Sequence, residues 1–356
     1  MQIVAMALAR NARTYFIRAN RAPHFHTGKS NMSETTMKAA VTTGGTLDLR
    51  EVPRPTPQPN EVLCKLRYCG LNRADLMHTA RPAGGPPSIP GMDWCGDVVA
   101  VGAEVKNTKA GDRVMCSGPG TGGYAEYAVT DWGRVLPAPA ALGDEQAAVA
   151  MLALQTMHDA LIVNGAMQAG DAVLIQGASA GVGLMGLQIA KLKGAKFVIG
   201  SSRNAAHRAR FQEFGADMAI DTGNDAWPDE VLKATGGKGV NVVVDQVSGK
   251  TVAQSMKACA TLARIVNVGR LGGNAAEIDF GVHALKRIHF IGVTFRSRSL
   301  DEVRELTRKM AADLWDDIAA GTLQLPIDRT FALDEAEAAQ QHMRANAHFG
   351  KILLRM

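Results

Sequence analysis

Two features that would narrow the function at once are missing from this sequence: a long apolar run and closely spaced metal-binding cysteines. No uninterrupted apolar stretch is long enough to span a bilayer, so the sequence predicts no membrane-spanning helix. The five cysteines are an odd number without the spacing of a metal site, which favours reduced thiols in a cytoplasmic or mitochondrial-matrix protein. They are Cys64, Cys69, Cys95, Cys116 and Cys259. With 356 residues, the chain is long enough for two domains with separate cores.

A strong excess of positive charge is also missing from most of the chain. The formal net charge is +5 at pH 7, but residues 1–36 contain five basic residues and one acidic residue, which leaves +1 for the rest. The sequence therefore predicts no nucleic-acid-binding surface. We interpret residues 1–36 first as a disordered extension, or as the product of an upstream start before Met37. The alternative is a mitochondrial presequence, because the segment is rich in arginine and poor in acids.

What the sequence does contain is a glycine-rich turn between a predicted strand and a predicted helix. Val173–Gln176 is a short apolar run, and Leu184–Lys191 has apolar residues at helical spacing. Between and within them, Gly181, Gly183 and Gly186 form the pattern G-x-G-x-x-G. In such a turn we expect the first glycine to allow the tight bend, the second to admit a pyrophosphate, and the third to let the helix approach its strand. The alternative is a glycine turn that serves packing alone, but the context favours a dinucleotide-binding site.

The end of the next predicted strand indicates which dinucleotide is bound. NAD sites usually place an acidic residue about twenty residues beyond the glycines, yet no acid lies between Gly183 and Glu213. Instead, Ser201, Ser202 and Arg203 offer two hydroxyls and a guanidinium, which suit the 2′-phosphate of NADPH. The alternative is that Arg203 is a solvated loop arginine. We predict NADPH as the cofactor.

The distribution of predicted elements divides the chain into parts. Residues 37–156 contain short strands and turns, whereas strands and helices alternate over 157–295, as βαβ units require. Among the short strands we expect one over Gly122–Val129. Helical segments follow from about residue 296, and Lys351–Leu354 is predicted as a closing strand. This pattern predicts an α/β protein with a doubly wound parallel sheet beside a mostly β domain.

Several short motifs, taken in order, carry a resemblance to a known family. The chain resembles the medium-chain dehydrogenase/reductase superfamily, and within it the zinc-free NADPH:quinone oxidoreductase group, from Met37 to the C-terminus. The motifs are Tyr68–Leu76, Gly91–Gly96, Gly111–Val114, Gly122–Glu126, Gly177–Gly183, Asp245–Gly249 and His348–Lys351. The resemblance implies a partly open-barrel, GroES-like catalytic domain formed by 37–156 and 296–356, and a Rossmann dinucleotide-binding domain over 157–295.

The resemblance also bears on the metal. Zinc-using relatives have a Cys at the place of Asn72 and a His at the place of Met92, and no Cys lies between Cys116 and Cys259 to match a further ligand. A catalytic zinc needs three protein ligands, and Asn and Met do not supply them. We therefore predict that the protein uses no metal.

The site residues expected from the resemblance fall into three sets. Asn72 and Asp75 are expected at the reacting centre, and Met92 and Thr156 beside the substrate cleft. For Asn72 and Asp75 the alternative is capping of the helix that follows. The expected cofactor contacts are Ala178, Gly181, Val182, Gly183, Ser201, Ser202, Arg203, Asp245, Val247, Gly269, Phe295 and Lys351.

The predicted function follows from the cofactor and the missing metal. Hydride transfer from NADPH to an electron-poor acceptor, first of all a quinone, needs alignment and a proton but no Lewis acid. The alternatives are an NADPH-dependent alkenal or enone double-bond reductase and a non-catalytic, crystallin-like NADPH-binding protein. Two departures from relatives affect this interpretation: no tyrosine occurs in Thr79–Pro87, and Thr222 stands where the family often has a tyrosine.

The resemblance implies one protein partner, a second copy of the chain. The apolar strand expected over His289–Phe295 would lie at the edge of the dinucleotide-binding sheet. Pairing with its symmetry mate would cover that edge in a closed two-fold dimer.

Overall fold

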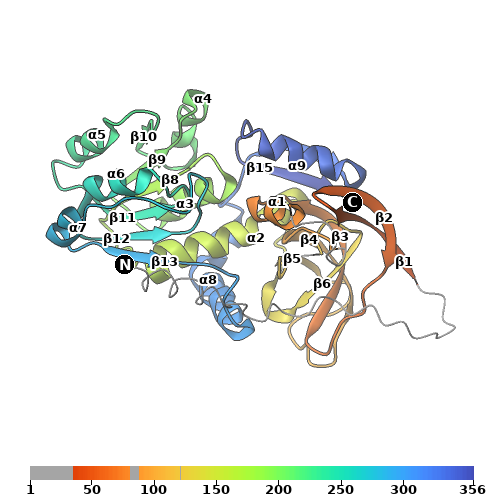
Figure 1. The fold of residues 1–356 in the computed structure, drawn as a ribbon. Coiled ribbons are helices and arrows are strands. Elements are labelled where there is room, and N and C mark those ends of the chain that lie inside the picture. Colours follow the sequence, from red (N-terminus) through yellow and green to blue (C-terminus); the bar gives the residue numbers. More distant parts are fainter. Residues whose placement is uncertain (1–34, 81–87, 121) are drawn as a thin grey trace, which may run out of the picture. The chain divides into compact units, whose positions relative to one another are not determined.

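The computed structural model describes residues 35–80, 88–120 and 122–356, and Figure 1 shows their arrangement. Residues 1–34 and the segment 81–87, which contains most of the loop without a tyrosine, lie outside the described residues. Two large sheets organise the remainder, one of six strands and one of seven.

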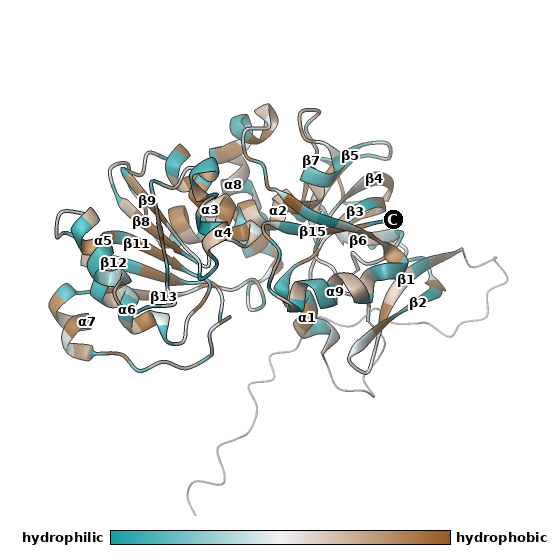
Figure 2. Ribbon diagram, turned by 90° about the horizontal axis from the view of Figure 1, so that it is seen from above, coloured by the Kyte–Doolittle hydropathy of each residue, from teal (hydrophilic) through white to brown (hydrophobic). Residues whose placement is uncertain are grey.

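The six-stranded sheet is entirely parallel, with strand order β10-β9-β8-β11-β12-β13. Its central strands are runs of valine, isoleucine and leucine with almost no exposure, because helices cover parallel sheets on both faces (Figure 2). The strands are β8 (Ala172–Gln176), β9 (Phe197–Ser201), β10 (Met218–Ile220), β11 (Val240–Asp245), β12 (Cys259–Asn267) and β13 (His289–Gly292). The connecting helices are α3 (Gly181–Leu192), α4 (Ala205–Arg208), α5 (Trp227–Ala234), α6 (Thr251–Ala258) and α7 (Phe280–Lys286), with a 3₁₀ turn at Phe211–Phe214.

The seven-stranded sheet is mixed, with order β14-β15-β3-β4-β5-β7 and β6 paired with β3. Its strands are β3 (Glu61–Gly70), β4 (Asp93–Val101), β5 (Arg113–Ser117), β6 (Tyr127–Asp131), β7 (Val135–Pro137), β14 (Ile327–Ala332) and β15 (Lys351–Arg355). The associated helices are α1 (Arg73–Thr79), α2 (Asp144–His158), α8 (Leu300–Ala320) and α9 (Ala336–Arg344), with 3₁₀ turns at Trp132–Arg134 and Leu333–Glu335. A hairpin of β1 (Thr36–Thr43) and β2 (Thr46–Pro53) precedes them. The predicted fold class, a parallel doubly wound sheet with a mostly β second part, is confirmed.

Two strands are shorter than the sequence predicts. The strand expected over Gly122–Val129 begins only at Tyr127, because Tyr124 and Ala125 bond to β1 instead: Ala40 N donates to Tyr124 O, and Ala125 forms an isolated bridge with Ala39. The strand expected over His289–Phe295 ends at Gly292, where its pairing with β12 ends.

Helix α2 is the main core helix and packs against α3, β4 and β5. Together with the π-helical turn Asp159–Asn164 it is long and apolar enough, by length and composition, to cross a membrane. The stretch is not an uninterrupted apolar run, because Gln155 and His158 lie within it, and 72% of its most apolar window is buried inside the protein. These are the properties of a core helix.

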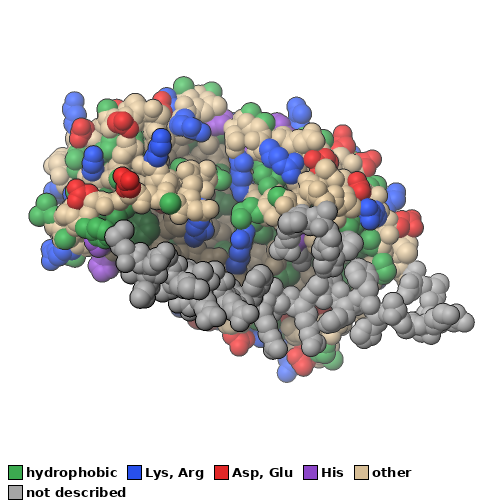
Figure 3. All heavy atoms as spheres, in the orientation of Figure 1, with side chains coloured by type: hydrophobic (Ala, Val, Ile, Leu, Met, Phe, Trp, Pro, Cys, Tyr) green, Lys and Arg blue, Asp and Glu red, His purple; other side chains and the backbone are tan. Residues whose placement is uncertain are grey.

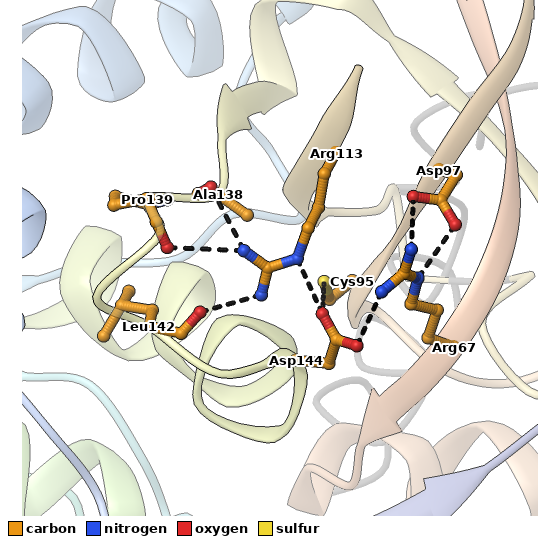
Figure 4. Close-up of polar contacts among 8 residues, drawn as sticks. All are labelled: Arg67, Cys95, Asp97, Arg113, Ala138, Pro139, Leu142 and Asp144. Carbon is orange, nitrogen blue, oxygen red and sulfur yellow. Dashed lines mark hydrogen bonds and ion pairs between the residues drawn. The ribbon is translucent and has the colours of Figure 1, made fainter. Parts of the chain in front are cut away.

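The first turn of α2 is fastened to the seven-stranded sheet by charged groups (Figure 4). The carboxylate of Asp144 accepts hydrogen bonds from Arg67 Nη1 at 2.8 Å and Arg113 Nε at 2.6 Å. Arg67 also binds both carboxylate oxygens of Asp97, while Arg113 donates to backbone carbonyls, including that of Leu142 at 2.8 Å. Residues from β3, β4 and β5 thus hold the start of the helix that lines the core.

Candidate active site

The glycine-rich turn joins β8 to α3 at the carboxyl end of the parallel sheet. Gly177 has φ +73°, a left-handed conformation that glycine adopts without a Cβ penalty. The N-cap of α3 is Ala180, whose methyl side chain cannot bond the N–H groups of the first turn. The N–H of Gly181 donates to Gly350 O at 3.1 Å, but the N–H groups that follow and the positive end of the helix suit an anion such as a pyrophosphate. The residues present fit a dinucleotide.

The individual glycines differ in role from the sequence-based expectation. The left-handed turn residue is Gly177, and the first glycine of the pattern, Gly181, lies under the side chain of Lys351: an added Cβ would be 2.4 Å from Lys351 Cδ. At Gly183 a Cβ would lie 2.7 Å from Ala178 Cα, so this glycine lets the helix start pass close to its own turn. At Gly186 it would lie 2.8 Å from Met157 Sδ, which means that the third glycine admits α2 rather than the strand.

The serines and the arginine at the end of β9 have separate roles. Ser201 is buried, its hydroxyl donates to Gln176 Oε1 at 2.6 Å, and it accepts from Gly177 N at 2.9 Å, so it holds the glycine turn in place. The hydroxyl of Ser202, which is half-buried, accepts from Asn204 N at 3.2 Å. Arg203, two residues after the end of β9, is exposed.

A second guanidinium near Arg203 is already engaged. Arg208 forms an ion pair with Asp221 at 3.0 Å and donates to the carbonyl of Ser202 at 2.8 Å. Sequence reasoning did not find this pair, although both residues follow strands that end at the same edge of the sheet. Of the two arginines, Arg203 is the cation left available to a phosphate.

The loop after β11 borders the glycine turn from the other side. Asp245 is fully buried, and its Oδ1 accepts from the N–H groups of Val247 and Ser248, both at 2.8 Å. Burial raises the pKa of Asp245, although these two bonds lower it. Ser248 Oγ donates to Gly269 O at 2.7 Å, and a Cβ at Gly177 would lie 3.2 Å from Val247 Cγ2. Asp245 thus shapes the loop that places Val247 and Gly269 beside the turn.

Asn72 and Asp75 stand at the start of α1. Asp75 Oδ2 accepts from Asn72 N at 2.8 Å, which is the capping role that the sequence left open for Asp75. The Asn72 side chain does something else: its Nδ2 donates to Gly70 O at 3.2 Å, and its Oδ1 accepts from Lys351 Nζ at 2.9 Å. Only Asp75 therefore caps with its side chain.

The carboxyl of Asp75 lies in a dry environment. It is 1% exposed, its Oδ2 also accepts from Tyr124 OH at 3.2 Å, and its Oδ1 has no hydrogen-bond partner among the described residues. Burial raises the pKa of Asp75 to about 7, although the bond from Asn72 N and the charge of Lys351 oppose the change. Burial and the neighbouring Asp75 also raise the pKa of Tyr124.

Lys351 connects the glycine turn to Asn72. It begins β15, directly after Gly350, whose N–H donates to Ser179 O at 3.0 Å and whose carbonyl accepts from Gly181 N at 3.1 Å. The Lys351 ammonium binds Asp93 Oδ2 at 3.1 Å as well as Asn72. The structure thus brings four residues together from distant parts of the chain: Asn72, Asp93, Gly181 and Lys351.

The structure places the other expected site residues in several different elements. Met92 is half-buried and immediately precedes Asp93, and Thr156 is half-buried near the end of α2. Phe295 follows β13, and its ring centroid lies 5.9 Å from the guanidinium of Arg298. Ala178 and Val182 belong to the glycine turn and to the first turn of α3.

Sequence reasoning missed two residues of the site. Asp93 lies inside the motif Gly91–Gly96, and Tyr124 inside Gly122–Glu126, but neither was expected to face Asn72 or Asp75. A charged residue in an otherwise apolar strand start was the available signal for Asp93, since a buried carboxylate needs a cation. Within the described residues, no three His, Cys, Asp or Glu side chains gather in a group that could hold a metal ion.

Comparison with known families agrees with the two parts of the fold. Residues 58–140 match the family described as "Alcohol dehydrogenase GroES-like domain", and residues 181–312 match the one described as "Zinc-binding dehydrogenase". Among curated proteins, the quinone oxidoreductase of Sus scrofa is 30% identical over 310 residues, which cover 85% of this chain and 92% of the relative. The quinone oxidoreductase of Rattus norvegicus is 29% identical with the same coverage.

Solved structures give the same result. The quinone oxidoreductase of Pseudomonas syringae pv. Tomato DC3000 has a TM-score of 0.81 and 28% identity, covering 90% of this chain and all of the relative. The Escherichia coli quinone oxidoreductase complexed with NADPH has a TM-score of 0.80 and 26% identity at the same coverage.

Proposed function

Because the chain belongs to the quinone oxidoreductase group of the medium-chain dehydrogenase/reductase superfamily, we propose that it transfers a hydride from NADPH to an electron-poor, quinone-type acceptor without a metal ion. The observation that carries the proposal is the contact of Lys351 with both Gly181 and Asn72, which places a polar amide next to the glycine turn. A reductase needs this proximity, because the acceptor must lie against the cofactor.

The choice of NADPH over NADH rests on Arg203. This exposed guanidinium at the end of β9 suits the 2′-phosphate, whereas Arg208 is paired with Asp221. Two of the similar solved structures are described as complexes with NADPH, one of them from Escherichia coli. The first turn of α3 would hold the pyrophosphate through the N–H groups of Val182 and Gly183, because the N–H of Gly181 donates to Gly350 O.

The proposed independence from metal rests on the donor chemistry of the site. Asn72 and Met92 stand where zinc-using relatives have Cys and His, and the amide of Asn72 is engaged by Lys351 and Gly70. An amide committed to these partners is a poor ligand for zinc. In this proposal, hydrogen-bond donors take the place of a Lewis acid.

The residues of this chain would bind, orient and shield the reactants. NADPH supplies the hydride, and as the new C–H bond forms, the electron pair moves onto the carbonyl oxygen of the acceptor, which then takes a proton from a polar donor or water. Buried Asp75, Asp93 and Tyr124 surround the Asn72 side of the site and keep its wall dry. A dry wall strengthens each hydrogen bond to a developing oxyanion.

The decisive experiment is steady-state oxidation of NADPH with a panel of ortho- and para-quinones and enones, with and without a chelator. We expect turnover with quinones, no effect of chelation, no stoichiometric zinc in elemental analysis, and no oxidation of simple alcohols with NADP. Alcohol oxidation that a chelator abolishes would contradict the proposal. Turnover of enones but not of quinones would instead assign the protein as an enone double-bond reductase. The same hydrogen-bond donors could act on the carbonyl oxygen of an enone.

A further inference from the structure

An acidic side chain lies beside the arginine that we assign to the 2′-phosphate. Asp221 directly follows β10, and Arg203 follows the neighbouring strand β9 at the same carboxyl edge of the sheet. Asp221 Oδ1 and Arg203 Cγ lie 2.9 and 3.9 Å from the point that a Cβ of Gly223 would occupy. A carboxylate so close to a phosphate weakens its binding by repulsion unless another charge compensates. An NADPH site at this edge therefore needs a cation for Asp221.

Asp221 has a structural reason to be present. Its Oδ1 accepts a hydrogen bond from the backbone N–H of Gly223 at 2.8 Å, which closes a turn directly after β10. Aspartate side chains are common in such turns, because they reach the N–H two residues further along the chain. The turn that ends β10 thus brings a carboxylate next to Arg203.

Arg208 supplies the compensating charge. It is the last residue of α4, and its Nη1 lies 3.0 Å from Asp221 Oδ2 and donates to the carbonyl of Ser202 at 2.8 Å. The loop after β9 is also held by its backbone, since Ser202 N donates to Ile220 O at 3.2 Å. One guanidinium therefore joins the loop that carries Arg203 to the turn that carries Asp221.

Arg203 differs from Arg208 in having no partner. Within the part of the chain that the structure describes, its guanidinium takes part in no ion pair and no hydrogen bond, and the residue is exposed. An arginine beside an uncompensated carboxylate would be drawn to it, because opposite charges attract strongly at short range. Arg208 already occupies the outer oxygen of Asp221, so Arg203 keeps its charge for another anion.

We propose that Arg208 determines the preference for NADPH without contacting the cofactor: it neutralises Asp221 and thereby keeps the guanidinium of Arg203 available to the 2′-phosphate. This inference rests on the proposed function, because it requires NADPH as the coenzyme. Arg208 is a positioning residue that acts through Asp221. The phosphate projects from the adenosine end of the cofactor, so an exposed cation can bind it without an enclosed cavity.

A double-mutant cycle of Arg208→Met and Asp221→Asn tests this assignment by fluorescence titration. Methionine keeps an unbranched side chain without the charge, and asparagine keeps an oxygen for the N–H of Gly223. Arg208→Met should raise the Kd of NADPH about five- to thirtyfold, because the uncompensated carboxylate attracts Arg203 and repels the phosphate. The Kd of NADH should change by less than about threefold, because NADH lacks the phosphate. In Arg208→Met/Asp221→Asn, the Kd of NADPH should return to within about threefold of the wild-type value, since no charge remains to be compensated.

Two further measurements separate charge from packing. Arg208→Lys keeps a positive charge but not the planar fork, and the Kd of NADPH should stay within about threefold of the wild-type value. The effect of Arg208→Met should also shrink as the salt concentration is raised, because salt screens exposed charges. A loss caused by disturbed packing would not respond to salt in this way.

The matched control is Lys191→Met. Lys191 pairs with Asp217 at 2.7 Å, and Asp217 directly precedes β10, so this pair lies at the amino-terminal end of the strand that Asp221 follows. The variant also deprives an aspartate of its cation, but at the end of the sheet opposite the glycine turn. We expect the Kd of both coenzymes to remain unchanged.

The outcomes distinguish this inference from the proposed function. A Kd of NADPH that stays high in Arg208→Met/Asp221→Asn would refute the role of Asp221, and an equal rise in the Kd of both coenzymes in Arg208→Met would show a structural role only. Either result leaves the proposed function intact if the wild-type protein binds NADPH more tightly than NADH and reduces quinones. Equal binding of the two coenzymes by the wild-type protein would overturn the choice of NADPH, and this inference with it.

Discussion

Arg203 is the residue on which the coenzyme preference depends. If its guanidinium binds the 2′-phosphate, Arg203→Ala should raise the Kd of NADPH by roughly ten- to a hundredfold, since a charge-assisted hydrogen bond contributes about 1.5–3 kcal/mol. The Kd of NADH, which lacks this phosphate, should hardly change. Both constants are measured by fluorescence titration. Arg308→Ala, which removes an exposed arginine on α8, is the control and should alter neither. An equal rise in the Kd of both coenzymes would show that Arg203 does not recognise the 2′-phosphate.

Asp75 makes a prediction about pH. Its pKa in the folded protein is about 7, above the ordinary 3.8, so the folded state retains a proton that the unfolded chain releases. As the pH rises from about 4 to 7, this group therefore lowers the free energy of unfolding by up to about 1.4 kcal/mol for each pH unit. Above pH 7 the destabilisation no longer changes with pH. Asp75→Asn removes the contribution. Relative to wild type, the variant should be more stable at pH 8 than at pH 5 in urea unfolding; an equal difference at both pH values would contradict the raised pKa.

The sequence predicted which residues form the glycine turn but not what each of them contacts. The pattern of Gly181, Gly183 and Gly186 is local, so it identifies the strand-turn-helix unit directly. The contacts are not local: Gly181 meets Lys351, and Gly186 meets Met157. In the same way, Asn72 was expected from the resemblance, while its bond to Lys351 joins residues 279 positions apart. Spacing along a chain carries no information about such a pair.

At the scale of elements, the first turn of α2 depends on Asp144. Burial raises the pKa of this carboxyl, but hydrogen bonds from Arg67 and Arg113 outweigh burial and bring it below the ordinary value. Asp144→Asn should lower the free energy of unfolding at pH 7 by about 1–2 kcal/mol, because it removes a carboxylate at a helix N-terminus that binds two arginines. Glu305→Gln, in an exposed pair on α8, is the control and should leave the free energy of unfolding almost unchanged.

The sign of the pH effect distinguishes this carboxylate from Asp75. A group whose pKa is lowered on folding stabilises the protein above its unfolded pKa, and the stabilisation is lost as pH falls through the folded pKa. The difference between Asp144→Asn and wild type should therefore shrink as the pH is lowered from 7 toward 3 in urea unfolding. A difference that stays constant over this range would mean that the charge of Asp144 is not what holds α2.

Element prediction from the sequence succeeded where the pattern is strong and failed where tertiary pairing decides. Strand β8 is buried on both faces, so the apolar run Val173–Gln176 predicted it to within one residue, whereas β13 at the sheet edge ends three residues earlier than expected. The strand expected from Gly122 begins at Tyr127, because a hydrogen bond from Ala40 takes the carbonyl of Tyr124. The position of β15 between β14 and β3 follows from no local signal.

For the whole molecule, we propose a two-fold dimer formed through β13. This strand is at the edge of the parallel sheet, with Phe290 51% exposed, and Leu285 and Phe280 of the preceding α7 are 80% and 72% exposed. Large apolar side chains gathered at an open edge favour a partner. By contrast, Lys, Arg, Asp and Glu side chains are interspersed over the face seen in Figure 3.

Light scattering at micromolar concentration should give the mass of two chains. Phe290→Lys should shift the mass toward one chain, because two added charges would face each other across the axis. Leu49→Lys, at another exposed apolar residue, is the control and should leave the dimer intact. A wild-type mass of one chain would contradict the assignment of β13.

The position of β15 has a consequence for the order of folding. The parallel sheet is built from residues 172–292, so its strands can pair soon after they leave the ribosome. Strand β3 can pair early with β4 and β6, but its pairing with β15 joins Gly70 to Leu353 across almost the whole described chain. Because closing so long a loop is entropically expensive, we expect the seven-stranded sheet to close last. Gly350 would then bond to the glycine turn, and Lys351 would reach both Gly181 and Asn72, only in that final step, so the site would be completed by the last part of the chain to be made.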